Sequence, residues 1–261
     1  MRIVRFTPGP DAGLGQDPFF GVLEDDGLIS IISGDPIYSG IQKSAATIAL
    51  SKVRLLAPII PRSKVVCVGK NYADHAAEMG GVVPDEPIIF LKPNTSVIGP
   101  NDTIVWPEMS ERIDHEAELA IVIGRICKDV PKERVNDVIF GYTIANDVTA
   151  RDLQKKDGQW TRAKSFDTFC PIGPWVDTDF VPGTQKITAT IAGEVKQSAQ
   201  ISDMIFDVPT IVNFVSRVMT LLPGDIILTG TPAGIGPMVA GEKATMAIEG
   251  LGELTNKVSA Q

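Results

Sequence analysis

The sequence predicts an α+β, strand-rich fold with few helices. Its apolar segments are short, rich in Val and Ile, and separated by turns that draw on 24 Gly and 19 Pro residues. Helical periodicity over several turns occurs only near residues 207–222. Strands and helices do not alternate in the βαβα order of a doubly wound sheet, so that architecture is not expected.

Residues 1–60 are predicted to form a small N-terminal β-rich domain, followed by a main domain over residues 61–261. Three short runs near the start, RIVRF, FFGVLED and LISIIS, are predicted strands, because Gly, Pro and Asp break the chain between them. The next segment, residues 44–58, is predicted to be partly helical. Pro58 and Pro61 then mark the domain boundary.

Further strands are predicted in the main domain from apolar runs bounded by Gly, Pro, Asn or Asp. In chain order these runs are KVVCVG, PIIFLKP, NDTIVWP, residues 116–124, DVIFGYTIAND, ITATIAG, IIL and ATMAIEGLGELTNKV. Short helices are predicted in YADHAAEMG, with a C-cap at Gly80 and Gly81, and in VTARDLQKK. A longer helix, DVPTIVNFVSRVMTLL, begins with Asp207 as N-cap and Pro209 in its first turn. Its apolar face, predicted to lie in the core, is Ile211, Phe214, Val215, Val218 and Leu222.

The composition argues against several classes of protein. The chain of 261 residues is 44% apolar and can bury a sizeable core, while its net charge of −8 argues against nucleic acid and anionic membranes as partners. The N-terminus lacks the apolar region of a signal peptide, and no stretch approaches the roughly 20 apolar residues of a membrane span. Cys67, Cys127 and Cys170 are expected to be reduced thiols, which fits a cytoplasmic protein.

Two acidic residues, Glu116 and Glu118, lie at the start of a predicted buried strand. In a strand, residues i and i+2 face the same side, with Cα atoms roughly 6.6 Å apart. Two carboxylates buried side by side repel each other, and a hard divalent cation such as Mg²⁺ or Mn²⁺ relieves that repulsion. The alternative to a metal site is that Glu116 and Glu118 lie on the solvent-exposed face of an edge strand, with both acids solvated.

Asp147, at the end of another predicted strand, is the third candidate metal ligand. If the chain turns helical there, Arg151 at i+4 and Gln154 at i+7 share a face with Asp147. One acid, one cation and one amide would then converge. The alternative interpretation is an N-cap aspartate with an i,i+4 salt bridge to Arg151.

His75 and Glu78, three residues apart in a predicted helix, are candidate catalytic residues. A carboxylate beside an imidazole orients the ring and raises its pKa, which makes a better general base. A surface helix pair is the alternative. His115 neighbours Glu116 but points to the other face of the strand, so it is not expected to join the site.

Lys164 stands in a stretch with few other charges, where it would stabilise negative charge developing near a metal, or simply be solvated. Thr231 lies in a strand that runs into a glycine-rich turn, and the backbone N–H groups of that turn could hold a carboxylate. The chain has no P-loop, no GxGxxG that opens a helix and no GxSxG. These absences disfavour nucleotide binding and serine-hydrolase chemistry.

Six of these segments together resemble the fumarylacetoacetate hydrolase family. They are VGKNYADHAAE, PIIFLKP, IDHEAELAIVIG, GYTIANDVTARDLQ, AKSFDTFCPIGPW and LLPGDIILTGTPAGIG, in the family's order over about residues 64–237. The resemblance implies a rolled, mixed β-structure in several layers, usually in a homodimer. Residues 1–60 resemble, more loosely, the small N-terminal domain of bacterial members.

The resemblance also implies roles for single residues. The implied ligands of Mg²⁺ or Mn²⁺ are Glu116, Glu118 and Asp147. The implied water-activating pair, on a lid that orders when ligand arrives, is His75 and Glu78. The family's active-site lysine corresponds to Lys164. Positions that match substrate contacts are Arg151, Gln154, Thr231 and, in FLKP, Lys92.

Such a site suits a 2-oxo acid, whose carboxylate and keto oxygens chelate the metal while Lys164 and the metal stabilise the enolate that forms. We expect C–C hydrolysis of an acylpyruvate-type substrate with release of pyruvate, because the His75–Glu78 pair is intact. Oxaloacetate decarboxylation and 2-hydroxyhepta-2,4-diene-1,7-dioate isomerisation share this intermediate and stay open as alternatives. A metal- and ligand-binding module without turnover is the remaining hypothesis.

Overall fold

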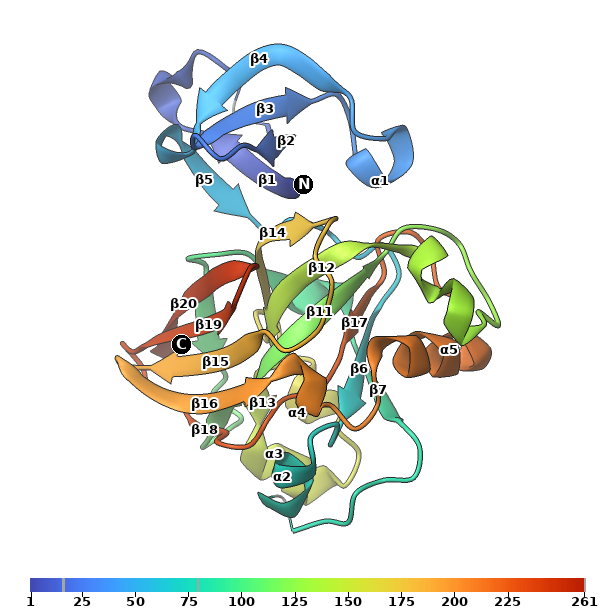
Figure 1. The fold of residues 1–261 in the computed structure, drawn as a ribbon. Helices are drawn as coiled ribbons and strands as arrows, with labels where there is room; N and C mark the ends of the chain where they lie inside the picture. Colours follow the sequence, from blue (N-terminus) through green and yellow to red (C-terminus); the bar gives the residue numbers. More distant parts are fainter. Residues whose placement is uncertain (16, 79, 261) are drawn as a thin grey trace.

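The computed structural model describes residues 1–15, 17–78 and 80–260, and β-strands dominate it (Figure 1). The largest sheet has 12 strands in the order β4-β3-β2-β1-β14-β12-β11-β17-β6-β7, with β5 paired to β1 and β8 to β14. Its strands are β1 (Arg2–Pro8), β2 (Phe19–Leu23), β3 (Leu28–Ile32), β4 (Lys43–Ala49), β5 (Val53–Leu56), β6 (Val65–Gly69), β7 (Ile88–Lys92), β8 (Val97–Ile98), β11 (Ala117–Ile123), β12 (Ile139–Asn146), β14 (Cys170–Asp177) and β17 (Ile226–Leu228). Most neighbours are antiparallel, but β17 and β6 run parallel, so the sheet is mixed.

Two smaller sheets complete the β-structure, with the orders β16-β15-β19-β20-β9 and β13-β10-β18. Their strands are β9 (Thr103–Trp106), β10 (Ile113–His115), β13 (Thr149–Ala150), β15 (Lys186–Ile191), β16 (Glu194–Gln200), β18 (Gly236–Pro237), β19 (Lys243–Ile248) and β20 (Gly252–Ala260). The five-stranded sheet contacts β11 and β12 of the large sheet through β15 and β19. The predicted strand-rich α+β fold with layered mixed sheets is confirmed.

The helices are short. They are α1 (Pro36–Ser39), α2 (Ala73–Glu78), α3 (Arg151–Asp157), α4 (Thr161–Lys164) and α5 (Val208–Val218). Short 3₁₀ helices occur at η1 (Pro10–Ala12), η2 (Leu50–Lys52), η3 (Asn94–Ser96), η4 (Lys132–Asp137) and η5 (Ile201–Asp203). None of the helices in the described ranges is long and apolar enough to cross a membrane.

Helix α5 confirms its predicted start but not all of its predicted core face. The Asp207 side chain caps it by accepting a hydrogen bond from Thr210 N at 2.9 Å. The buried residues are Val208, Ile211, Val212, Val215 and Ser216. The prediction was wrong for Val218, which is 53% exposed, and Phe214 is only partly buried. The helix ends at Val218, so Leu222, which is also partly buried, lies outside it.

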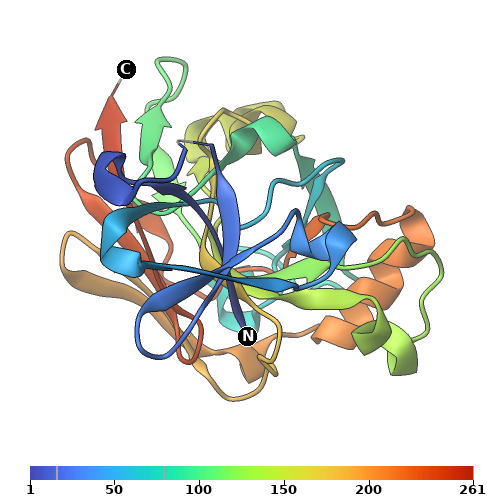
Figure 2. The ribbon, with the colours of Figure 1, turned by 90° about the horizontal axis from the view of Figure 1, so that it is seen from above.

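The N-terminal segment extends the main sheet. Residues 44–58 were predicted to be partly helical, and this is wrong: strands β4 and β5 occupy most of the segment, with the turn η2 between them. Strand β1 pairs with β14 through Arg2–Asp177 and Ile3–Val176. Figures 1 and 2 show the N-terminal strands stacked over one end of the main body. The domain boundary at residue 60 stays a prediction.

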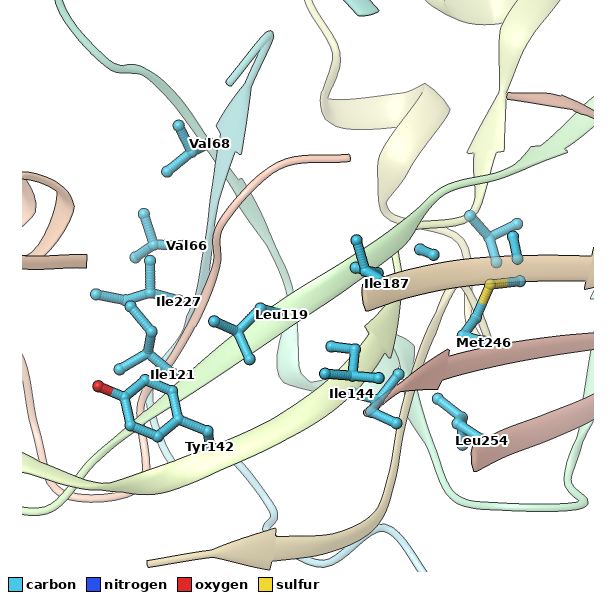
Figure 3. Packing of buried hydrophobic residues seen from close by; sticks show 14 of the residues in the cluster. Val66, Val68, Leu119, Ile121, Tyr142, Ile144, Ile187, Ile227, Met246 and Leu254 are labelled. Atoms are coloured by element: carbon cyan, nitrogen blue, oxygen red, sulfur yellow. The ribbon is translucent and has the colours of Figure 1, made fainter. Parts of the chain in front are cut away.

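The main core packs against one face of β11 (Figure 3). Leu119 and Ile121 of β11 lie in one buried cluster with Ile144 of β12 and with Ile187 and Met246 of the five-stranded sheet. The alternate residues of β11, Ala120 and Val122, belong to a second buried cluster on the opposite face of the sheet. With apolar packing on both faces, β11 is a rigid support for the acidic residues at its start.

Candidate active site

Acidic side chains from two neighbouring strands meet in the interior. Single carboxylate oxygens of Glu116, Glu118 and Asp147 lie within 4.8 Å of one another. Glu118 is in β11, and Glu116 directly precedes that strand, while Asp147 directly follows β12. The two strands are antiparallel, with Ala117 opposite Asn146, so the start of β11 lies beside the end of β12. The three acids are 4%, 2% and 1% exposed. The solvated edge strand is excluded, because β11 is hydrogen-bonded to both β12 and β17.

Two of the three carboxylates contact cations at the cavity. Lys164 Nζ donates to Glu116 Oε2 at 2.8 Å and to Asp147 Oδ2 at 2.6 Å. Arg151 Nη2 donates to the other Glu116 oxygen at 2.5 Å. Burial raises the pKa of Glu116, but Lys164 and Arg151 outweigh burial and hold this pKa well below its usual value. Burial lowers the pKa of Lys164, but Asp147 and Glu116 raise it above its usual value, so the ammonium stays charged.

Glu118 differs from its two neighbours. Within the described residues its carboxylate has no cationic partner in hydrogen-bond contact, and it accepts one backbone hydrogen bond, from Gly230 N at 2.6 Å. Burial and the nearby charges of Asp147 and Glu116 raise the pKa of Glu118 well above its usual value. A buried carboxylate whose charge is uncompensated, beside two others, fits a hard divalent cation. The donor set therefore fits Mg²⁺ or Mn²⁺.

The acid cluster lines a cavity of about 180 Å³. The residues around it are Val68, Gly69, Lys70, His75, Phe90, Glu116, Glu118, Asp147, Arg151, Gln154, Lys155, Trp160, Lys164 and Thr231. The cavity thus brings together residues from β6, α2, β7, β11, α3, α4 and the glycine-rich turn after β17.

His75 lines this cavity, and Glu78 contacts it from outside the lining residues. His75 in α2 is 5% exposed, and its Nδ1 lies 3.2 Å from Glu78 Oε2. The surface-pair alternative is therefore wrong for the imidazole, which is buried, although Glu78 itself is exposed. Glu78 also accepts a hydrogen bond from Gly234 N at 3.2 Å, which ties α2 to the glycine-rich turn. His115 lies outside the cavity, where its Nδ1 is 3.2 Å from Gln197 Oε1. Since Nδ1 of His75 contacts Glu78, the opposite edge of the His75 ring, which carries Nε2, is available to a molecule in the cavity.

Arg151 and Gln154 line the cavity, but not for the predicted reason. Helix α3 begins at Arg151, after the short strand β13, so Asp147 shares no helical face with either residue. The N-cap alternative is also wrong, because Ala150 occupies that position. Arg151 donates to Asp114 at 2.9 Å and to Gln154 at 2.6 Å as well as to Glu116. Its guanidinium is therefore largely committed to other side chains.

Thr231 and Lys92 are placed differently. Thr231 lines the cavity, donates its hydroxyl to Ala117 O at 2.9 Å and accepts from Gln197 Nε2 at 2.8 Å. The glycine-rich turn does hold a carboxylate with its backbone, as predicted, but the carboxylate is that of Glu118. Lys92 is absent from the lining residues given above; its buried ammonium pairs with Asp147 Oδ1 and donates to Val148 O at 3.1 Å.

Sequence reasoning missed one buried acid of this network. Asp114 is 0% exposed and accepts from Arg112 Nε at 2.7 Å and from Arg151 Nε at 2.9 Å. It stands two residues before Glu116, so the period of two that identified Glu116 and Glu118 extends back to it. The missed cavity residues Lys70, Phe90, Lys155 and Trp160 carry no such local signal.

Replacement of Lys92 by Met is expected to lower the free energy of unfolding of the metal-free protein by roughly 3 kcal/mol. The substitution leaves the buried Asp147 without one of its two ammonium partners. Denaturant unfolding in chelator measures the change, with Lys186→Met on the exposed side of β15 as control. Equal stability of Lys92→Met and wild type would show that the Lys92–Asp147 pair contributes nothing.

Comparison with known proteins agrees with this geometry. The family model described as fumarylacetoacetate (FAA) hydrolase C-terminal matches residues 64–259, and one described as Rv2993c-like, N-terminal, matches residues 1–58. The chain belongs to the fumarylacetoacetate hydrolase family. The predicted resemblance is confirmed, and the chain is an enzyme of that family.

Three relatives show the range of activities in this family. A 5-carboxymethyl-2-hydroxymuconate delta-isomerase from Mycobacterium smegmatis is 47% identical, with a TM-score of 0.91 over 100% of both chains. The oxaloacetate tautomerase FAHD2A of Bos taurus is 39% identical over 99% of this chain and 91% of the relative. A maleylpyruvate hydrolase from Sphingobium sp. SYK-6, in complex with manganese(II) and pyruvate, is 31% identical, with a TM-score of 0.81 over 100% of this chain and 99% of that chain.

Proposed function

We propose that this family member is a Mg²⁺- or Mn²⁺-dependent hydrolase that cleaves a C–C bond of acylpyruvate-type 2-oxo acids and releases pyruvate. The observation that carries the proposal is the buried carboxylate cluster, with the charge of Glu118 uncompensated, in one cavity with His75, whose imidazole contacts Glu78. The relative that was solved with manganese and pyruvate supports both the metal and the product.

A divalent cation bound by the three acids would supply a Lewis acid for the carboxylate and keto oxygens of the substrate. His75 takes a proton from water as the water attacks the distal carbonyl carbon, and Glu78 stabilises the imidazolium that results. The C–C bond then breaks towards the pyruvate side, where Lys164 stabilises the enolate. The imidazolium returns its proton to the methylene carbon, which gives pyruvate and a carboxylic acid.

A second candidate is enol–keto isomerisation of a 2-oxo acid without water attack. Two of the relatives described above, named as a tautomerase and an isomerase, favour it. The same His75–Glu78 pair would move a proton between carbon and oxygen, and Lys164 would again stabilise the enolate. The two candidates differ only in whether His75 activates water.

An assay of the metal-loaded protein separates the two candidates. With an acylpyruvate and Mg²⁺ or Mn²⁺, hydrolysis releases pyruvate in equal amount to the substrate lost, whereas isomerisation converts the enol of oxaloacetate to its keto form without pyruvate. We expect pyruvate release, and a fall of about 10²–10⁴-fold in kcat for His75→Ala. Asp74→Asn, an exposed change on the same helix, is the control. Rapid oxaloacetate ketonisation without any acylpyruvate cleavage would replace the hydrolase proposal with the second candidate.

A further inference from the structure

One buried amide approaches the candidate active site from the five-stranded sheet. Gln197 lies in β16, the strand at one end of that sheet's order, and it is not among the described residues that line the cavity. Its neighbours Lys196 and Ser198 are exposed, whereas Gln197 is 0% exposed. Burying an amide costs free energy unless its polar atoms are hydrogen-bonded, so the partners of Gln197 indicate what it stabilises.

The side chain of Gln197 has a partner for every polar group that it carries. Its Oε1 accepts a hydrogen bond from Ala117 N at 2.9 Å and lies 3.2 Å from His115 Nδ1. Its Nε2 donates to Thr231 Oγ1 at 2.8 Å and to Pro232 O at 2.7 Å. Since a backbone N–H only donates and a carbonyl oxygen only accepts, the contacts with Ala117 and Pro232 permit one orientation of the amide. The side chain is therefore a fixed link between two backbone segments.

The first of these segments carries two of the candidate metal ligands. Ala117 stands between Glu116 and Glu118, and the Thr231 hydroxyl, which accepts from Gln197, donates to Ala117 O at 2.9 Å. Three hydrogen bonds thus form a closed ring through Ala117, Gln197 and Thr231. In such a ring each hydrogen bond polarises the next, so the loss of one member weakens the others.

The second segment is the glycine-rich turn, residues 230–234. At its start Gly230 N donates to Glu118 Oε2 at 2.6 Å, and at its end Gly234 N donates to Glu78 Oε1 at 3.2 Å. One short turn therefore holds both a candidate metal ligand and the carboxylate that contacts the catalytic imidazole.

Strand β16 supports this turn at two points. Near the start of the turn, Gln197 donates to Thr231 and Pro232. At its end, Gly234 has a φ of +95° and packs so closely on β16 that a Cβ added to it would clash with Lys196 O. The contact at Gly234 is one of van der Waals packing, whereas Gln197 fixes the start of the turn with directed hydrogen bonds.

We propose that Gln197 is a positioning residue, which keeps the glycine-rich turn in the place where it holds Glu118 for the metal and Glu78 for His75. The inference rests on the metal site and the His75–Glu78 pair of the proposed function, and it holds for either of the two candidate reactions. Gln197 contacts neither metal nor substrate and acts through the turn. Removal of a residue that supports a metal ligand in this way typically costs about 10–100-fold in metal affinity or activity.

Replacement of Gln197 by Met tests this role, because Met has nearly the same shape and lacks the amide. We expect titration calorimetry to show Mg²⁺ and Mn²⁺ binding about tenfold more weakly at an unchanged stoichiometry. In saturating metal, kcat should fall by about tenfold or more while KM is unchanged, because Glu78 is displaced and the residues that line the cavity remain.

The matched control is Asn256→Leu. Asn256 is a buried amide of the same sheet, in β20, and it donates to Gly99 O at 2.8 Å and to Asp102 O at 2.9 Å rather than to the turn. This variant should lower the melting temperature in chelator, as Gln197→Met does, and leave metal affinity and kcat unchanged. The comparison separates a loss of positioning from a loss of stability.

If Gln197→Met keeps the metal affinity of wild type, or its kcat in saturating metal, the positioning role is overturned. If Gln197→Met does not fold, Gln197→Asn, whose amide is one methylene shorter, is measured in its place. Failure of both variants to fold would show that the fold, and not the site, requires Gln197. Wild type that binds neither metal would refute the proposed function and this inference with it. Wild type that binds metal without turnover refutes the proposed function alone, and the metal affinity of Gln197→Met then decides the inference.

Discussion

Replacement of Glu118 by Gln is expected to weaken Mg²⁺ and Mn²⁺ binding by at least about 100-fold and yet to raise the melting temperature measured in chelator. Burial and two neighbouring carboxylates destabilise the ionised form of Glu118. Within the described residues, the hydrogen bond from Gly230 N is the one contact that stabilises it. Gln keeps the shape and an oxygen that accepts from Gly230, but it removes the repulsion. Loss of affinity together with gain of metal-free stability is the signature of a residue kept for its ligand.

Titration calorimetry with each metal and thermal unfolding in chelator measure the two effects. Glu108→Gln, an exposed residue before β10, is the control and should change neither. In excess metal the order of stabilities should reverse, because wild type binds the metal more tightly and gains more binding free energy than the variant. Unchanged metal affinity in Glu118→Gln would remove the carboxylate cluster as the metal site, and with it the proposed chemistry.

The sequence contained the local half of this site. Glu116 and Glu118 were predictable because side chains two apart in a strand share a face wherever the strand lies. The same holds for His75 and Glu78, which one turn of helix brings together. Such pairs depend on backbone geometry alone, so neither needs the tertiary fold to be known.

The convergence of these pieces was not predictable from spacing. Asp147 joins the cluster through the register of β11 and β12, not through the helical face proposed for it. Lys92 pairs with Asp147 because the fold places the end of β7 beside that residue, and the spacing of residues in the sequence does not predict this placement. Lys70 and Lys155 likewise line one cavity only because the fold brings the end of β6 and the helix α3 to it. Distant strand order and register come from packing across the whole sheet, which is why only the family resemblance anticipated the assembled site.

Replacement of Lys164 by Met is expected to lower kcat by about 10³-fold while divalent metal binding is retained. The Lys164 ammonium bonds two of the three carboxylates and lines the cavity, so it has two separable effects. It pairs with buried acids in the metal-free protein. In the proposed reaction it would also stabilise the negative charge of the enolate. Loss of the first effect destabilises the metal-free protein and leaves Glu116 and Asp147 freer to bind a cation.

Saturating Mg²⁺ separates these two effects of Lys164. The metal supplies positive charge to the same carboxylates, so it should restore the stability of Lys164→Met to near that of metal-loaded wild type. It does not replace the Lys164 ammonium at the position proposed to contact the enolate, so kcat should stay low. Thermal unfolding and pyruvate release, measured on the same samples with Lys156→Met as control, give both readouts. Recovery of activity together with stability would show that Lys164 only balances charge, and would leave the enolate without a protein cation to stabilise it.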